Sequence, residues 1–247
     1  MQRAAEPYYE PWSCCLKYMT LKTDLESEVK KIFRSQWTTR DGTVIPGDDS
    51  VTLGNDAVKI DATVLYADLA DSTDMVDGYK PEFAAEVYKT FLHCSAKIIR
   101  AEGGEITAYD GDRIMAVYIG DSKNTNAVRT SMKIAWAVEY IVQPALKSIY
   151  TKTDFQVKHV CGVDTSKLFV AKTGVRGAND LVWVGRAANY AAKLSAFSSD
   201  CSKYITESVY SSMNDKVKYS NGTNMWQEYG QLNGEKVYKS TWWWSID

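Results

Sequence analysis

The sequence contains no long apolar run. No stretch approaches the roughly 20 consecutive apolar residues that a membrane-spanning helix needs. The first residues, MQRAAEPYYEPWSCC, lack the apolar core of a secretory signal peptide. We therefore expect no membrane association and a cytoplasmic location.

Cysteine pairs and an excess of one charge are also absent. The five cysteines are an odd number and form no CxxC pair, which argues against a zinc or thiol-redox framework. Lysines and arginines number 29 against 31 acidic residues, so the formal net charge is only -2. Such a balance creates no global basic field, and we expect no nucleic-acid partner. Any phosphate-binding site must then be local.

The composition that remains is that of a globular protein. Hydrophobic residues make up 45% of the 247 residues, enough for a substantial core. Apolar residues at helical spacing predict an amphipathic helix over 20–37, and the Gly- and Asp-rich stretch after it predicts a linker. We divide the chain into an N-terminal arm, 1–57, and a catalytic-size domain, 58–247.

Within the second domain, helical and strand patterns alternate. They predict helices over 81–101, 124–148, 186–197 and 205–213, and strands over 60–67, 155–163, 167–173 and 180–184. Four further strands are expected in EITAYDGD, RIMAVYIG, MWQEYG and EKVYKSTWWW, the first two joined by a tight turn. This order predicts an α/β (α+β) sandwich, with helices packed on a mixed or mostly antiparallel sheet.

Two acidic residues stand at strand ends. Asp68 follows the apolar run IDATVLYA, and Asp112 closes the turn between two strands. If both carboxylates face one point they repel each other, unless a divalent cation such as Mg²⁺ lies between them. The small residues Ala70, Ser72 and Thr73 after Asp68 are typical of an anion-binding turn. Taken singly, each acid also fits a plain turn or a solvated hairpin corner.

Asn189 and Lys193 form a second polar pair. Their spacing of four places them on one face of the helix expected over 186–197, so that one amide and one cation can reach the same ligand. The alternative is an ordinary solvated lysine on an alanine-rich helix.

Three segments carry a family resemblance: VLYADLADST, GGEITAYDGDRIMAVY and VWVGRAANYAAKLS. In this order, over about 58–215, they resemble the catalytic domain of class III nucleotidyl cyclases. The resemblance implies a ferredoxin-like palm, with two Mg²⁺ or Mn²⁺ ions held by Asp68, Asp112 and the main-chain carbonyl of Leu69. It further implies that the backbone of Ala70, Asp71, Ser72 and Thr73 binds the terminal phosphates. In the same way it implies that Asn189 orients the ribose and that Lys193 neutralises charge that develops on the phosphate.

The resemblance also implies a homodimer. The acids lie in the first half of the domain and Asn189 and Lys193 in the second, and the family joins these halves across two subunits to form composite active sites. The 8 tryptophans and 16 tyrosines suit interface anchors, although core packing explains them equally well. In the segment LNGEKVYK, Lys236 resembles a phosphate-binding lysine of some members, with a solvated lysine as the alternative.

The chain departs from the family pattern at three positions. Lys193 stands where the family usually has Arg, which keeps the charge but loses the planar fork. Ala108 and Val182 stand where adenylate cyclases have a lysine and an aspartate that read the base. Apolar side chains make no such hydrogen bonds, so the usual purine selectivity is unsupported.

Bacterial antiphage pyrimidine cyclases, the Pycsar group, are similar in size and keep the metal aspartates without the purine-reading pair. In this sequence Tyr109, Arg113 and Arg186 stand near the relevant turns as candidate contacts to a smaller base. For each of the three the alternative is structural: a strand tyrosine or a solvated surface arginine.

We therefore expect a nucleotidyl cyclase that converts a nucleoside triphosphate, UTP first and CTP second, to the 3′,5′-cyclic monophosphate and pyrophosphate. The resemblance implies that a separate effector protein reads the product. One alternative is a catalytically silent cyclase-like domain that binds a nucleotide or dimerises. Others are a purine cyclase with an atypical base pocket, or another palm-type enzyme.

Overall fold

The computed structural model describes residues 20–246 and divides the chain into two compact units, residues 1–37 and 38–247. In the first unit, helix α1 (Leu21–Arg34) begins after Thr20, whose hydroxyl accepts a hydrogen bond from the Thr23 N–H. The helix ends three residues earlier than the pattern over 20–37 predicts. Its apolar stripe is exposed and consists of Leu21, Leu25, Val29, Ile32 and Phe33.

The second unit is built on a nine-stranded sheet with the order β10-β11-β7-β5-β2-β4-β3, to which β1 adds beside β2 and β6 beside β5. Its strands are β1 (Thr38–Asp41), β2 (Asp56–Leu69), β3 (Glu105–Asp110), β4 (Arg113–Tyr118), β5 (His159–Val175), β6 (Ala178–Val184), β7 (Lys203–Thr206), β10 (Gln227–Leu232) and β11 (Glu235–Ser240). Only the β1–β2 and β5–β7 pairs are parallel in this sheet. The mostly antiparallel sheet confirms the fold class that the sequence predicts.

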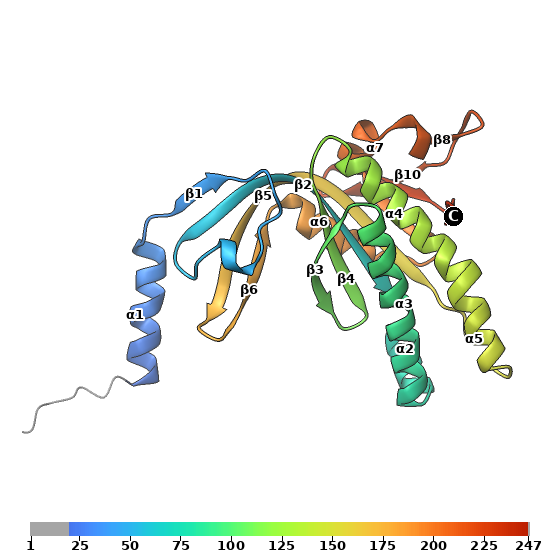
Figure 1. Cartoon of the computed structure of the whole chain (residues 1–247), viewed down its shortest axis with the longest axis horizontal. Coiled ribbons are helices and arrows are strands. Elements are labelled where there is room, and N and C mark those ends of the chain that lie inside the picture. The colour runs from blue at the N-terminus through green and yellow to red at the C-terminus, as the bar shows by residue number, and fades with distance from the viewer. Residues whose placement is uncertain (1–19, 247) are drawn as a thin grey trace, which may run out of the picture. The chain divides into compact units, whose positions relative to one another are not determined.

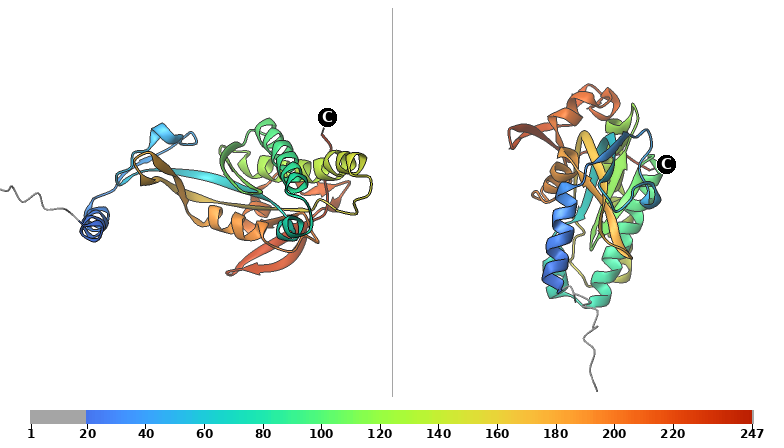
Figure 2. Two further views of the ribbon diagram at one scale, coloured as in Figure 1. Left: turned by 90° about the horizontal axis from the view of Figure 1, so that it is seen from below. Right: turned by 90° about the vertical axis from the view of Figure 1, so that its left-hand side faces the viewer.

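Helices cover both faces of this sheet (Figures 1 and 2). On one face lie α3 (Pro81–Ala101) and α4 (Lys123–Ala137), which continues through a π-helical turn (Val138–Val142) into α5 (Gln143–Ile149). On the other face α6 (Arg186–Ser195) packs against β5 and β2. Alternate residues of β2 enter the two cores, Leu65 on the α3–α4 side and Val64 on the α6 side. Because both faces of β2 are buried, its sequence is a nearly continuous apolar run.

One strand prediction is wrong. The sequence suggests a break between strands at 155–163 and 167–173, whereas β5 is a single strand from His159 to Val175 that pairs with β2 over thirteen residues. The polar residues that suggest the break have partners inside the fold. Asp164 is fully buried, and the Ser166 hydroxyl accepts the Ala187 N–H at the start of α6. Their polarity reflects tertiary contacts rather than a loop.

The C-terminal part differs from the predicted helix over 205–213. Residues 203–206 form strand β7, and only α7 (Glu207–Ser212) is helical. A 3-10 turn (Asp215–Val217) and a short hairpin, β8 (Tyr219–Ser220) with β9 (Thr223–Asn224), follow. None of the helices within residues 20–246 is both long and apolar enough to cross a lipid bilayer.

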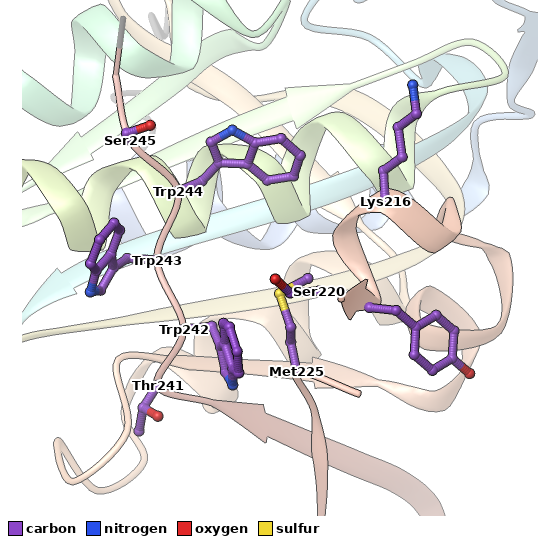
Figure 3. A pocket seen from close by; sticks show the side chains of 9 residues that line it. Lys216, Ser220, Met225, Thr241, Trp242, Trp243, Trp244 and Ser245 are labelled. Carbon is purple, nitrogen blue, oxygen red and sulfur yellow. The ribbon is translucent and has the colours of Figure 1, made fainter. Parts of the chain in front are cut away.

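The C-terminal tail packs on its own chain. The Trp244 N–H donates to the Met132 carbonyl on α4 at 3.3 Å, and the Trp243 and Tyr140 rings meet edge to face at 5.1 Å. A cavity of about 620 Å³ opens between this tail and the segment 216–225, with the three tail tryptophans along one side (Figure 3). Trp243 and Trp244 of the tail thus have partners within one chain.

Candidate active site

The fold brings Asp68 and Asp112 to the same edge of the sheet. Asp68 lies one residue before the end of β2 and directly opposite Arg113, the first residue of β4. The turn between β3 and β4 holds Gly111 at φ 62°, a backbone conformation that favours glycine, and Asp112 follows it. Arg113 also pairs with Asp110 across this turn at 2.6 Å. The hairpin thereby fixes Asp112 beside the end of β2.

The electrostatics of this pair show two acids held close together. Burial, followed by the charge of Asp112, raises the pKa of Asp68 to about 6. In Asp112 the Oδ2 atom is buried and has no hydrogen-bond partner within the described residues. A buried carboxylate oxygen without a partner is costly, and a divalent cation is a natural partner for it. The two side chains therefore fit a metal.

The protein supplies few ligands at this point. Within residues 20–246 no group of three or more His, Cys, Asp or Glu side chains is arranged to hold a metal ion. A cation between Asp68 and Asp112 would complete its shell with oxygens from the backbone, water or a substrate. Magnesium bound through one or two carboxylates plus substrate phosphates follows this pattern.

In the turn after Asp68, part of the backbone already takes part in hydrogen bonds within the protein. The Ala70 N–H donates to the Lys158 carbonyl at 2.9 Å and so cannot also bind a phosphate. Asp71 adopts a left-handed conformation with φ 60°, and Ser72 begins α2 (Ser72–Gly78), a helix that the sequence reading missed. The Lys158 ammonium lies 3.5 Å from the Asp71 carboxylate. Lys158 thus brings a cation to the turn.

Tyr66 lies beside the two acids, and sequence reasoning did not single it out. It lies two residues before Asp68 on the same face of β2, and its ring is half-buried. The guanidinium carbon of Arg113 stands 5.3 Å from the centre of that ring. Arg113 is thus held between Tyr66 and Asp110. The available signal was the even spacing of Tyr66 and Asp68 along one strand.

Asn189 and Lys193 share the outer face of α6, as their spacing predicts. The helix buries Ala187, Ala191 and Leu194 against the sheet, while both polar side chains are exposed. No hydrogen bond or ion pair joins either of them to the two acids within residues 20–246.

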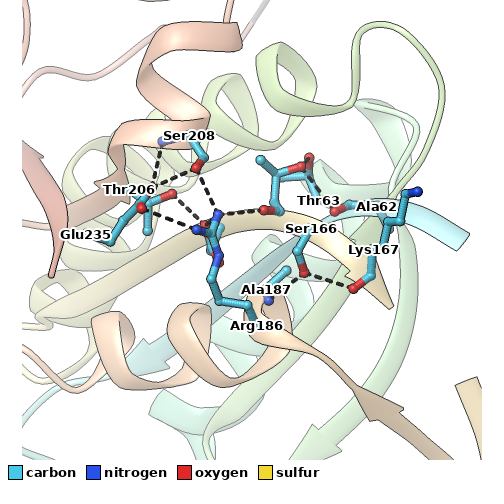
Figure 4. Close-up of polar contacts among 11 residues, drawn as sticks. Ala62, Thr63, Ser166, Lys167, Arg186, Ala187, Thr206, Ser208 and Glu235 are labelled. Carbon is cyan, nitrogen blue, oxygen red and sulfur yellow. Dashed lines mark hydrogen bonds and ion pairs between the residues drawn. The ribbon is translucent and has the colours of Figure 1, made fainter. Parts of the chain in front are cut away.

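Arg186 lies at the start of α6 in a polar network (Figure 4). Its guanidinium donates to both Asp164 carboxylate oxygens, at 3.1 and 3.2 Å, and to Glu235 at 3.2 Å. It also donates to the Ser208 hydroxyl at 2.8 Å, and Thr206 donates to Asp164 at 2.5 Å. The network ties α6 to β5, β7, α7 and β11.

The remaining candidates lie apart from this network. Tyr109 is 56% exposed at the end of β3, so its ring is free to meet a ligand. Ala108 faces Met115 in the β3–β4 ladder, and Val182 is exposed on β6 opposite Ala171. Lys236 pairs with Glu228 across the β10–β11 hairpin at 3.2 Å.

Comparison with known proteins gives full-length relatives. No family model matches the chain. It is 56% identical to a uridylate cyclase of Xanthomonas perforans over 232 residues, covering 93% of this chain and 100% of that protein. It is 49% identical to a uridylate cyclase of Burkholderia cepacia, covering 92% and 100%. Among solved structures, the adenylyl cyclase CyaB from P. aeruginosa superposes with a TM-score of 0.62 at 18% identity, covering 74% of this chain and 95% of that one.

Proposed function

The chain belongs to the class III nucleotidyl cyclases, within the family of the uridylate cyclases, and from this premise we propose that it converts UTP to 3′,5′-cyclic UMP and pyrophosphate. The ribose 3′-hydroxyl forms a bond to the α-phosphorus, the bond to the β-phosphate oxygen breaks, and the hydroxyl proton is lost. CTP is the second candidate substrate, since both bases are small enough for a site that lacks the purine-reading pair.

The observation that carries the proposal is the Asp68–Asp112 pair. The charge of Asp112 contributes to raising the pKa of Asp68, and Asp112 has a buried oxygen that lacks a partner, an arrangement that is expensive unless a cation binds there. We propose that both carboxylates, with the Leu69 carbonyl, hold two Mg²⁺ or Mn²⁺ ions. When bound, such ions lower the pKa of a hydroxyl and neutralise charge on a triphosphate.

The base would meet Tyr66 and Arg113. A ring beside Asp68 offers a stacking surface, and the guanidinium held over it offers donors for the carbonyl oxygens of uracil. Tyr109 is not assigned to this base site, because it pairs with Ile114, whose side chain enters the core on the α3–α4 side, the opposite face of the sheet from Tyr66. For the phosphates, Asp71, Ser72 and Thr73 remain as backbone donors, because the Ala70 N–H is already used.

Arg186, in contrast, is assigned a positioning role. Its guanidinium makes hydrogen bonds to Asp164, Ser208 and Glu235, which leaves it poorly placed to read a base. By fixing the start of α6 to the sheet, it orients Asn189 and Lys193 for the ribose and the phosphate.

The catalytic pair would come from a second copy of the chain. Asn189 and Lys193 are exposed on α6, and neither has a hydrogen bond or ion pair to the two acids of its own chain within the described residues. We propose a homodimer in which each site combines Asp68 and Asp112 of one subunit with Asn189 and Lys193 of the other. The cyclic product would then act as a second messenger for a separate effector protein, in keeping with the antiphage group that the sequence resembles.

The direct test incubates the purified protein with Mn²⁺ and each of the four nucleoside triphosphates separately, followed by chromatography of the products. Cyclic UMP as the main product supports the proposal, and cyclic CMP moves the assignment to the second pyrimidine. Cyclic AMP or cyclic GMP would show that the base pocket selects a purine without the usual pair. An Asp112→Asn variant is the control for contaminating activity.

One other candidate function is that of a catalytically silent domain, and Lys193 is the residue that supports it. Lysine at this position keeps the charge but loses the planar fork of the usual arginine, which weakens support for the transition state. In that case the protein binds UTP with Mn²⁺, measurable by calorimetry, and releases no pyrophosphate. A Lys193→Arg variant that gains turnover from an inactive parent would identify this case.

A further inference from the structure

Lys203 on β7 is an unusual buried cation. Its side chain is 0% exposed, and it takes part in no ion pair within the described residues. Its ammonium donates to the Ser202 hydroxyl at 2.6 Å. Burial lowers the pKa of Lys203 to about 8, opposed by the thiols of Cys161 and Cys201. A positive charge at this depth, without a carboxylate, attracts an anion.

His159 lies close to Lys203 and is also short of partners. It is the first residue of β5 and only 5% exposed, and its Nε2 atom is buried without a hydrogen bond in the described part of the chain. Burial and the charge of Lys203 lower the pKa of His159 to about 3, so the imidazole is neutral. A neutral imidazole can still donate one hydrogen bond, from Nε2 in the appropriate tautomer.

A cavity of about 310 Å³ adjoins these groups. We call it the Ser202 cavity; its wall includes His159, Ser202, Lys158, Tyr140 and Trp243. It contains none of the residues 68–73 or 112, and is therefore separate from the active site. Because Ser202 accepts the hydrogen bond from Lys203, its own proton is free to point elsewhere.

We propose that the Ser202 cavity binds a small phosphate anion, free or as a phosphate ester, through the Ser202 hydroxyl and the Nε2 of His159, over the buried charge of Lys203. Lys158 also lines the cavity, and its ammonium lies 3.5 Å from the Asp71 carboxylate, which neutralises part of its charge. Glu139 also lines the cavity, but its side chain is exposed and its charge is solvated. The Tyr140 and Trp243 rings offer an apolar wall for the organic part of an ester.

Such a ligand would lie against the phosphate-binding turn of the active site. His159 faces Leu69 in the β2–β5 ladder, and the Lys158 carbonyl accepts the Ala70 N–H. A shift of residues 158–159 on binding is transmitted directly to the turn that holds Asp71. We therefore infer that phosphate in this cavity changes the cyclase rate, a consequence that rests on the proposed function, whereas the binding itself does not.

The test uses the fact that the protein has only two histidines. His93 is exposed on α3 and serves as an internal reference for His159. Inorganic phosphate is titrated into ¹⁵N-labelled protein at constant ionic strength while the imidazole ¹H–¹⁵N signals are recorded. The His159 signals are expected to shift saturably, and the His93 signals are not. A parallel titration with uridine monophosphate distinguishes the ester, by tighter binding, from free phosphate.

Ser202→Ala is the decisive variant, because it removes the hydroxyl that would donate to the anion; it also removes the acceptor of the buried Lys203 ammonium, so an unchanged amide ¹H–¹⁵N spectrum must first show that the variant is folded. It should weaken phosphate binding at the His159 signals about tenfold. The matched control Ser148→Ala, on the surface of α5, should bind as the parent does. Unshifted His159 signals, or the same titration curve in Ser202→Ala as in the parent, would overturn the proposal, the latter because phosphate bound elsewhere would cause the shift. The cyclase rate should respond to phosphate in the parent and not in Ser202→Ala; if the protein makes no cyclic nucleotide, the imidazole titration still decides the binding.

Discussion

Asp68 and Arg113 face each other in the antiparallel β2–β4 ladder. This pairing fixes the positions of the other candidate site residues relative to Asp68. Arg113 directly follows Asp112 in the sequence, and its guanidinium lies over the Tyr66 ring. The carboxylates for a metal and the ring and guanidinium for a base are thus carried by two neighbouring strands. The predictions below follow from this arrangement and from the network at α6.

Asp68 should destabilise the metal-free protein at neutral pH. Its folded pKa of about 6 lies above the unfolded value of about 3.9. The group therefore contributes stability that is fully present below about pH 4 and lost as the pH rises through 6. With chelator present, Asp68→Asn should raise the free energy of unfolding at pH 7.5 by about 1–2 kcal/mol, allowing for solvent screening of a half-buried group.

Urea denaturation at two pH values measures this effect. At pH 4.5 Asp68 is protonated in the folded protein but largely ionised in the unfolded one, so the variant should differ from the parent by only about a third of the difference at pH 7.5. A stability difference of the same size at pH 4.5 and 7.5 would mean that the Asp68 charge is not the cause.

Asp112 and Asp110 provide a matched pair of substitutions on one turn. Asp112 has the unpartnered buried oxygen, whereas the Asp110 side chain is 74% exposed and pairs with Arg113. Asp112→Asn should reduce kcat by at least about a thousandfold, since it removes a metal ligand. Asp110→Asn should keep kcat within about tenfold of the parent. Comparable losses in both variants would point to the turn's structure rather than to a metal ligand.

Tyr66 should contribute to substrate binding through its ring. Tyr66→Phe keeps the ring and should leave the KM for UTP within about threefold of the parent, whereas Tyr66→Ala should raise it about tenfold or more, in line with base–aromatic stacking. Steady-state kinetics with UTP measure both. An unchanged KM in a folded Tyr66→Ala protein would remove this ring from the base site.

Arg186 should matter for stability as well as for turnover. Arg186→Ala leaves the fully buried Asp164 without its cation, and we expect a loss of about 3 kcal/mol or more in unfolding free energy. Arg176→Ala, in the exposed β5–β6 turn, should change it by less than about 0.5 kcal/mol.

The milder Arg186→Lys variant separates positioning from folding. A lysine cannot span Asp164, Ser208 and Glu235 at once, so α6 should be held less firmly and kcat should fall while the KM for UTP changes little. A large rise in KM with kcat unchanged would instead mark Arg186 as a contact to the base.

Much of the fold could be read from local patterns. The helix over 81–101 matches α3 residue for residue, and the hairpin around Gly111 was evident from its turn sequence. The continuous β5 could not be read, because the partners of Asp164 and Ser166 lie more than twenty residues away in the sequence. The short helix α2 and strand β1 carry too few residues to show a period.

For the candidate site, too, some residues could be proposed from the sequence and others could not. Asp68 and Asp112 could be proposed as metal ligands because Asp68 ends a strand pattern and Asp112 closes a turn, and the charge of Asp112 contributes to the raised pKa of Asp68. Tyr66 escaped notice because an aromatic residue inside a strand is usually core. Arg186 donates a hydrogen bond to Glu235, which lies almost fifty positions later in the sequence, and no local sequence pattern reveals such a contact.

The central claim is that one active site uses Asp68 of one subunit and Lys193 of the other. The most direct measurement co-expresses Asp68→Asn and Lys193→Ala chains with two different affinity tags and purifies the heterodimer over both. Such a dimer has one site carrying both changes and one intact site, so it should recover about half of the parent's activity, while each variant alone is nearly inactive. A tandem-purified heterodimer as inactive as the two variants would contradict the account.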